Sequence, residues 1–240
     1  MRKHIPNFVT TINLFCGCCA LVFVFKGLFF WVFISLLICG AADYIDGMVA
    51  RALNVKSPIG KELDSLADMV SFGVVPGAII YKLLTISPIG IESNSIIEWW
   101  ALAGFIIPVF ACLRLAKFNL DERQSEDFIG LNTPACTMFV TGLMLIYHYD
   151  SAGLANLVIE PVFLYSVVIV FSYLLVAEIP MFSFKFKGLQ WKGNENRIVF
   201  ISIALLLLIL LKEIAFSLII ILYILYSLIS HFILKKVDRT

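Results

Sequence analysis

The sequence predicts an all-α fold: a polytopic membrane bundle of about eight transmembrane helices with both termini in the cytoplasm. Three observations support this prediction. Of the 240 residues, 61% are hydrophobic and only 15% are charged, which is more apolar surface than a soluble domain of this length needs. Apolar runs close to the length of a membrane span recur along the chain, and the basic residues gather in alternate connections between those runs.

Eight apolar runs give the predicted helices in order, because a backbone in hydrocarbon must satisfy its own hydrogen bonds. They cover about residues 8–25, 28–50, 64–84, 97–118, 133–149, 157–179, 197–211 and 214–234. The first run resembles a signal peptide, but no clear small-residue cleavage site follows it, so we expect a retained helix. Only Lys212 and Glu213 separate the last two runs, which form either a tight hairpin or one kinked segment. Without an internal repeat, residues 1–240 are predicted to form one domain.

The basic residues predict the orientation. If the N-terminus is inside, only Lys26, Lys82 and Lys212 lie in outer turns, and the other 15 of the 18 Lys and Arg residues face the cytoplasm. This bias satisfies the positive-inside rule for an even number of spans. We therefore expect an integral membrane protein, and the Phe- and Ile-rich composition favours a bacterial inner membrane. Membrane lipids are expected partners, and nucleic acid is not.

Four aspartates interrupt the apolar sequence at the cytoplasmic ends of the second and third spans. Helical spacing places the motif residues on two stripes, which are Asp43, Asp46, Gly47 and Ala50 on one helix, and Gly60, Asp64 and Asp68 on the next. A break at Asn54–Pro58 would bring the stripes face to face. Each aspartate near a membrane helix centre costs about 2.5–3.5 kcal/mol, so four unpaired ones would cost roughly 10–14 kcal/mol.

Metal binding is the best physical explanation of these carboxylates, because the few nearby basic residues cannot neutralise them as well as divalent cations can. Oxygen ligands select hard ions such as Mg²⁺, Mn²⁺ or Ca²⁺, and the motif contains no His or Cys that would favour zinc. Gly47 lets another group approach the helix closely, and Arg51 offers a rigid fork for a phosphate. These residues indicate a site for phosphoryl transfer from a diphosphate, and the alternative is an ion-pathway cluster in a transporter.

The spacing of the motif adds a family resemblance. The chain reads Asp43-x2-Asp46-Gly47-x2-Ala50-Arg51-x8-Gly60-x3-Asp64-x3-Asp68. At every defined position this resembles the signature of the CDP-alcohol phosphatidyltransferases. The resemblance implies two divalent cations, Mg²⁺ or Mn²⁺, that are bound on the cytoplasmic side by Asp43, Asp46, Asp64 and Asp68. It also implies that Asp68 is the catalytic base and that the enzyme is a homodimer.

The resemblance also assigns residues to the CDP-linked donor. These donor-binding candidates are Pro6, Asn7, Gly47, Arg51 and Ser57. Pro6 and Asn7 belong to a short segment that is similar to the family's N-terminal element, which lines the nucleotide pocket. In the implied reaction, an acceptor hydroxyl attacks the β-phosphorus of the donor and CMP leaves.

Two later segments concern the acceptor alcohol. ACLRLAKFNLD at 111–121 and FIGLNTPA at 128–135 resemble segments of the membrane-integral phosphatidylserine synthases, although Lys117 and Asn132 depart from the usual pattern. This resemblance implies CDP-diacylglycerol and L-serine as substrates, with Arg114, Lys117 and Asn119 as candidate serine-binding residues. Alternatively, the two basic residues are ordinary cytoplasmic anchors balanced by neighbouring acidic residues. Glycerol-3-phosphate or inositol phosphate would be expected to need a denser basic pocket than this sequence shows.

Overall fold

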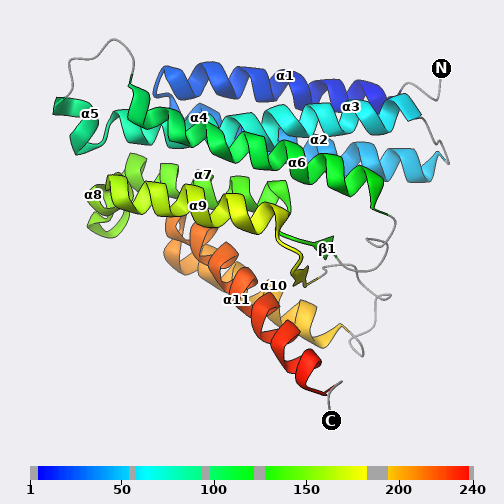
Figure 1. The fold of residues 1–240 in the computed structure, drawn as a ribbon. Helices are drawn as coiled ribbons and strands as arrows, with labels where there is room; N and C mark the ends of the chain where they lie inside the picture. The colour runs from blue at the N-terminus through cyan, green and yellow to red at the C-terminus, as the bar shows by residue number, and fades with distance from the viewer. Residues whose placement is uncertain (1–4, 54–57, 93–97, 122–127, 183–193, 238–240) are drawn as a thin grey trace.

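The computed structural model describes residues 5–53, 58–92, 98–121, 128–182 and 194–237. Within these residues the protein is all-α, as predicted, apart from one antiparallel pair of two-residue strands, β1 (Phe128–Ile129) and β2 (Pro180–Met181). Figure 1 shows long helices that run roughly alongside one another, with the last two inclined to the rest.

Each predicted apolar run corresponds to helical structure. The main elements are α1 (Ile5–Phe25), α2 (Phe29–Ala52), α3 (Pro58–Asp68), the π-helix η2 (Met69–Val74), α4 (Val75–Thr85), the 3₁₀-helix η3 (Trp99–Phe105), α6 (Ile106–Leu120), α7 (Thr133–Tyr149), α9 (Pro161–Val176), α10 (Glu195–Leu211) and α11 (Glu213–Val237). Three short elements were not predicted, namely α5 (Pro88–Glu92), η5 (Ser151–Gly153) and α8 (Ala155–Val158). The third predicted span is thus one continuous helical segment that begins earlier than expected, at Pro58.

Five helical segments of the described chain are long and apolar enough to cross a membrane. They are Ile5–Phe25, Phe29–Ala52, Pro58–Thr85, Trp99–Leu120 and Glu213–Ser230. The protein is therefore an integral membrane protein. The helices α7, α9 and α10 have 17, 16 and 17 residues, which is shorter than the usual span of about 20. The count of eight crossings accordingly stays a prediction.

Several helix ends follow from local sequence. Gly27 adopts a left-handed φ of 70° in the connection between α1 and α2, where a side chain would be strained. Pro58 and Pro161 are the first residues of α3 and α9, positions where the missing N–H of proline has no cost. Asn132, one of the two departures in the acceptor-side segments, is the N-cap of α7, and its side chain accepts a 2.8 Å hydrogen bond from the Ala135 N–H.

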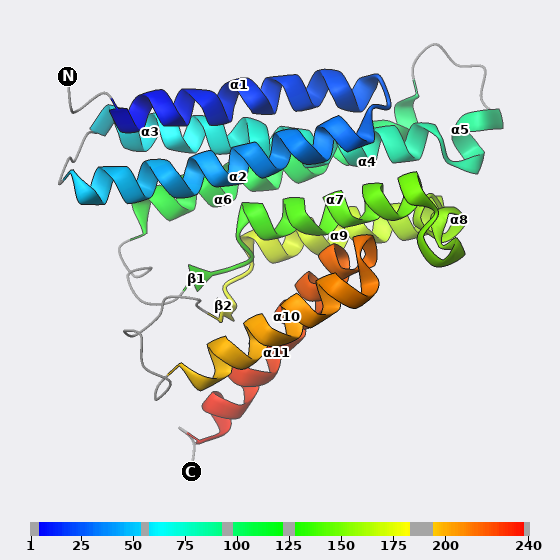
Figure 2. The same cartoon turned by 180° about the vertical axis from the view of Figure 1, so that it is seen from behind.

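The helices form successive layers, with α1 to α4 and α6 first, α7 and α9 next, and α10 and α11 last (Figure 1 and Figure 2). The core lies mainly on α4 and α7, whose apolar side chains are almost entirely buried. A Cβ on Gly77 of α4 would lie 2.6 Å from the Pro108 ring, so a glycine is needed where α4 crosses α6. In contrast, α10 has no buried residue in the described part of the chain.

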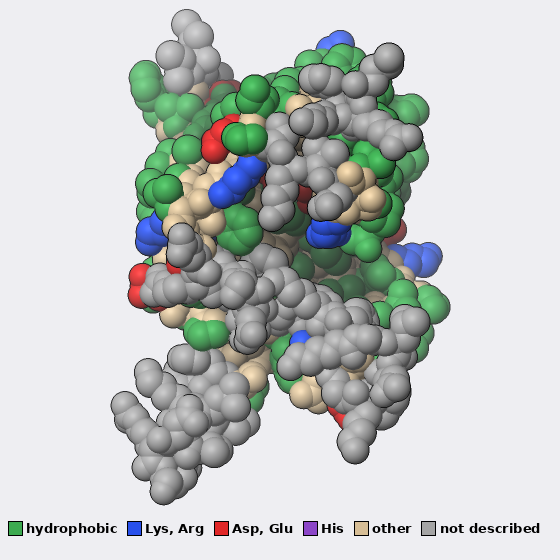
Figure 3. Space-filling model, turned by 90° about the vertical axis from the view of Figure 1, so that its right-hand side faces the viewer, with side chains coloured by type: hydrophobic (Ala, Val, Ile, Leu, Met, Phe, Trp, Pro, Cys, Tyr) green, Lys and Arg blue, Asp and Glu red, His purple; other side chains and the backbone are tan. Residues whose placement is uncertain are grey.

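The described helix ends that flank the predicted cytoplasmic connections lie toward the same side of the bundle. In Figure 1, α1 begins, α2 ends, α3 begins, α6 ends and α11 ends on the right-hand side, and β1 also lies there. Figure 3 looks onto this end, where Lys, Arg, Asp and Glu side chains lie among apolar ones. The helix ends named above therefore lie on the side that a chain of spans with alternating directions requires. The side of the membrane on which this end lies stays a prediction.

Candidate functional site

Three of the four motif aspartates converge on one point between α2 and α3. Carboxylate oxygens of Asp43, Asp64 and Asp68 lie within 4.8 Å of one another, and all three residues are half-buried. Asp46 lies one turn further along α2, outside this group of three, and is 7% exposed. The two stripes inferred from helical spacing thus face each other as expected.

Helix α1 packs against both α2 and α3, and two of its side chains form hydrogen bonds with motif carboxylates. The Thr10 hydroxyl donates a hydrogen bond to Oδ2 of Asp46, and the Asn13 Nδ2 donates one of 3.1 Å to Oδ1 of Asp68. Asn13 is completely buried and Thr10 is 3% exposed. Two buried side chains, one turn apart on α1, therefore orient one carboxylate on each neighbouring helix.

The approach of α1 to the third span depends on Gly17. A Cβ at this position would lie 3.2 Å from Cα and Cβ of Ser71, so the two backbones are as close as a glycine permits. Ser71 belongs to η2, the π-helix that starts immediately after Asp68 and includes a bond from the Val75 N–H to the Val70 carbonyl. Such wide turns within α-helices occur frequently at functional sites. Here the wide turn directly follows Asp68, the residue that Asn13 contacts.

A cavity of about 240 Å³ opens beside Asp46 and Asp64. Its walls come from the first three helices and comprise Pro6, Asn7, Thr10, Asp46, Gly47, Ala50, Gly60, Lys61 and Asp64. The structure thus brings together three of the predicted donor-binding residues, Pro6, Asn7 and Gly47. A Cβ on Gly47 would meet no atom within 4 Å. This glycine therefore leaves space in the cavity and is not needed for close packing between helices.

The two remaining predicted donor-binding residues are Arg51 and Ser57. Arg51 is exposed in the last turn of α2 and does not line the cavity. Ser57 lies outside the described residues. Lys61, which the sequence analysis did not select, lines the cavity, and its Nζ donates a 2.8 Å hydrogen bond to the Asn119 carbonyl at the end of α6.

The carboxylate group of three fits a hard cation. Oδ1 of Asp64 is buried and has no hydrogen-bond partner among the described residues, although a buried carboxylate oxygen normally has one. Three carboxylates this close repel one another unless a positive charge lies between them, and oxygen atoms are the ligands that Mg²⁺ and Mn²⁺ prefer. The geometry therefore supports a divalent-cation site at Asp43, Asp64 and Asp68.

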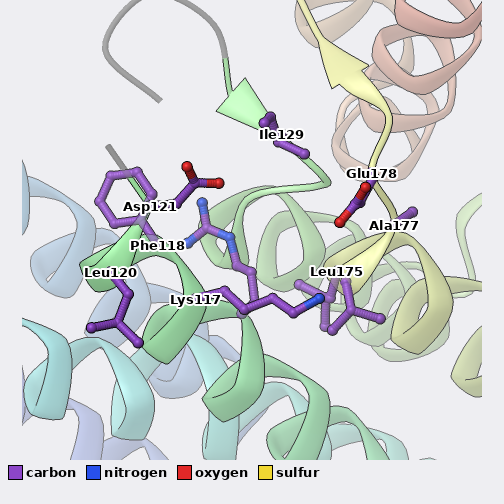
Figure 4. A pocket seen from close by; sticks show the side chains of 10 residues that line it. Lys117, Phe118, Leu120, Asp121, Ile129, Leu175, Ala177 and Glu178 are labelled. Carbon is purple, nitrogen blue, oxygen red and sulfur yellow. The ribbon is translucent and has the colours of Figure 1, made fainter. Parts of the chain in front are cut away.

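A second cavity, of about 310 Å³, lies where α6 and α9 end. Its lining includes Arg114 and Lys117 from α6, together with Asp121 and Glu178 (Figure 4). Arg114 is 8% exposed and interacts electrostatically with Asp68. Two of the three predicted serine-binding residues, Arg114 and Lys117, therefore line one cavity.

Asn119, the third predicted serine-binding residue, is not part of this cavity. Its Nδ2 donates a 2.8 Å hydrogen bond to the Ser65 hydroxyl, so it connects the end of α6 to α3. Ser65 follows Asp64 in α3. The amide of Asn119 thus supports the backbone that carries the motif carboxylates.

The comparisons with known proteins agree with this geometry. The model of the CDP-alcohol phosphatidyltransferase family matches residues 3–181. The chain belongs to the CDP-alcohol phosphatidyltransferase family. It is 31% identical over 179 residues to a CDP-diacylglycerol–serine O-phosphatidyltransferase of Bacillus subtilis, covering 67% of this chain and 89% of that protein. It is 30% identical over 243 residues to the protein of the same name from Helicobacter pylori, covering 97% and 93%.

A third relative with this name, from Methanocaldococcus jannaschii, is 32% identical over 138 residues, or 58% of this chain and 59% of that protein. The residues matched by the CDP-alcohol phosphatidyltransferase family include both cavities and the carboxylates, and they end before α10. Family membership makes the protein a transferase and rules out the transporter interpretation of the aspartate cluster.

Sequence reasoning missed Thr10, Asn13, Lys61 and Glu178. A signal for the first two was present, because Thr10 and Asn13 are polar residues three apart near the start of a largely apolar span. Glu178 carried no such signal, since it lies 64 positions after Arg114 and joins the cavity only through the fold.

Proposed function

We propose that this protein transfers the phosphatidyl group from CDP-diacylglycerol to L-serine, giving phosphatidylserine and CMP. One observation carries the proposal: the carboxylate cluster contributes a residue to the first cavity and has a charge partner in the second. Asp64 lines the cavity with the predicted donor-binding residues, and Asp68 interacts electrostatically with Arg114, which lines the other cavity. The names of relatives that match nearly the whole chain favour serine as the acceptor.

The donor side would bind the cytidine diphosphate portion. Pro6, Asn7 and Gly47 lie at the cavity wall. Arg51, which does not line that wall, and Ser57, which lies outside the described residues, keep the roles that the family signature implies. Two divalent cations, Mg²⁺ or Mn²⁺, would be held by the four aspartates, Asp43, Asp46, Asp64 and Asp68. When bound, such ions neutralise the charge that develops on the diphosphate and align it for in-line displacement.

The chemical step uses Asp68 as the base. Its carboxylate takes the proton of the serine hydroxyl as the serine oxygen bonds to the β-phosphorus, and the bond from that phosphorus to the CMP oxygen breaks. The hydrogen bond from Asn13 engages one carboxylate oxygen of Asp68, so the other oxygen would take the proton. Arg114 and Lys117, which line the second cavity, would bind the serine carboxylate.

The setting of the reaction is also part of the proposal. The end of the bundle with both cavities would face the cytoplasm of a bacterial inner membrane, because most basic residues of the sequence lie in the connections that the positive-inside rule assigns to the cytoplasm. The enzyme would act as a homodimer, which crosslinking or light scattering of the detergent-solubilised protein measures. Reporter fusions at the C-terminus measure the orientation.

Product formation from a panel of acceptors tests the function. The purified protein is incubated with labelled CDP-diacylglycerol and L-serine, glycerol-3-phosphate or inositol phosphate, with and without chelator. We expect labelled phosphatidylserine and CMP with serine alone, and neither product after chelation. The folded Asp68→Asn variant is expected to be inactive. Equal turnover with glycerol-3-phosphate would refute serine as the acceptor, and normal turnover by Asp68→Asn would refute the assigned base.

A further inference from the structure

The cavity at the ends of α6 and α9 contains both signs of charge. Arg114 and Lys117 lie one turn apart on α6, while Asp121 follows that helix and Glu178 follows α9. Figure 4 shows Asp121 on one side of the cavity and Glu178 on the other, and the Lys117 side chain extends toward Leu175. The carboxylates therefore line the same cavity as the basic residues.

Arg114 shows that the cavity is more than a solvated surface. Its side chain is 92% buried, since only 8% is exposed, and its guanidinium lies 5.4 Å from the centre of the Phe118 ring. Its Nε is buried and has no hydrogen-bond partner in the described part of the chain. A buried, unpaired guanidinium donor is costly, and an anionic group of a ligand would satisfy it.

The position of Glu178 is fixed by the backbone around it. Helix α9 ends at Val176, and Ala177 is extended with φ of −62° and ψ of 140°. The next residues pair with the segment before α7: the Gly130 N–H donates a 2.9 Å hydrogen bond to the Ile179 carbonyl, and Phe128 pairs with Met181 in the small sheet. Glu178 thus occupies a defined place on the wall, although its side chain is exposed.

The geometry points to Glu178, flanked by Asp121, as the group that binds the ammonium of the acceptor and so selects a zwitterionic amino alcohol. This inference rests on the proposed function. L-Serine has a carboxylate and an ammonium on one carbon, so its carboxylate can contact Arg114 and Lys117 while its ammonium contacts Glu178 in the same cavity. A phosphorylated alcohol has no ammonium, and its second negative charge is repelled by the same carboxylates.

Charge-selective substitutions test this assignment. Glu178→Gln keeps the size of the side chain and removes its charge, and Glu178→Asp retains the charge. Glu62→Gln is the matched control, because Glu62 is also exposed, lies at the same end of the bundle and lines neither of the two cavities. The measurements are kcat, the KM for serine, the KM for CDP-diacylglycerol and the thermal unfolding temperature in detergent.

We expect Glu178→Gln to raise the KM for serine by roughly 10- to 100-fold, the loss typical of one charge-assisted hydrogen bond. The KM for CDP-diacylglycerol and the unfolding temperature should not change. Glu178→Asp should recover part of the loss, and Glu62→Gln should match the wild type. With 3-hydroxypropionate, which lacks the ammonium, the wild type and Glu178→Gln should react equally slowly.

The outcomes separate this inference from the proposed function. If the wild-type enzyme releases no CMP with serine, the proposed function fails. If the wild type uses serine but Glu178→Gln keeps a serine KM within twofold of it, the ammonium assignment alone is wrong and Glu178 is an ordinary surface charge. If Glu178→Gln unfolds at a lower temperature, Glu178→Ala provides the second measurement, and an unchanged serine KM in that variant also overturns the assignment.

Discussion

Replacing Asn13 with alanine tests whether α1 orients the catalytic base. The substitution removes the 3.1 Å hydrogen bond from Nδ2 to Oδ1 of Asp68, in a position with no solvent exposure. A hydrogen bond to a charged group contributes about 1.5–3 kcal/mol. If all of this orients Asp68 for proton transfer, kcat falls by about 10- to 150-fold. The KM for serine should change little, because Asn13 lines neither cavity.

The assay is steady-state CMP release by purified protein in detergent, with serine and CDP-diacylglycerol varied separately. Ser217→Ala is the matched control: Ser217 is 5% exposed and donates a 2.9 Å hydrogen bond to the Phe139 carbonyl, away from the carboxylates. Both variants lose one buried hydrogen bond, so both should unfold at a slightly lower temperature. Only Asn13→Ala should lose turnover.

A second substitution distinguishes the loss of the Asn13 hydrogen-bond donor from the loss of its side-chain volume. Asn13→Asp keeps the size of the side chain but replaces the donor with a further carboxylate beside Asp68, so it should lose at least as much activity as Asn13→Ala. A folded Asn13→Ala protein with kcat within twofold of the wild type would show that the base needs no support from α1.

The remaining predictions concern the metal, the donor cavity and the link between α3 and α6. Chelation should reduce CMP release to background, and Mg²⁺ or Mn²⁺ should restore it, whereas a chelator-resistant rate would contradict the cation site. Gly47→Val fills open space, so it should raise the KM for CDP-diacylglycerol at least roughly tenfold with an unchanged unfolding temperature. Ser65→Ala removes the acceptor for Asn119 and should destabilise the protein by about 1 kcal/mol, measured as a lower unfolding temperature. An unchanged unfolding temperature would show that this bond contributes nothing.

The helical spans and the carboxylate motif were predictable because each depends on local sequence. The apolar run at 133–149 coincides with α7, and the run at 28–50 lies within one or two residues of α2. The motif spacing alone placed Asp43 opposite Asp64 and Asp68, since two helices joined by a short break leave few ways to face each other. Composition and periodicity thus determine which segments are helical and which faces carry the polar residues.

Contacts between distant segments were not predictable in this way. The hydrogen bond from Thr10 to Asp46 requires one particular axial alignment of α1 against α2, and hydropathy does not determine that alignment. The resemblance of its segment made Asn119 a candidate for serine binding, but it did not predict that the Asn119 amide donates a hydrogen bond to the Ser65 hydroxyl of α3. The position of Glu178 on the cavity wall depends on the pairing of β1 with β2, and strands of two residues leave almost no pattern in a sequence.

The π-helical turn at Met69–Val74 has a consequence for chain length. Each residue of an α-helix advances the rotation by about 100°. Deleting one residue from this turn, and thereby restoring regular α-geometry, would rotate α4 by roughly that angle relative to Asp68. The apolar face of α4 would then lose its neighbours, or the carboxylate would swing away from its two companions. An insertion or a deletion within Met69–Val74 should therefore reduce stability or activity far more than one at the start of α3 or the end of α4, even when the inserted or deleted residue is apolar.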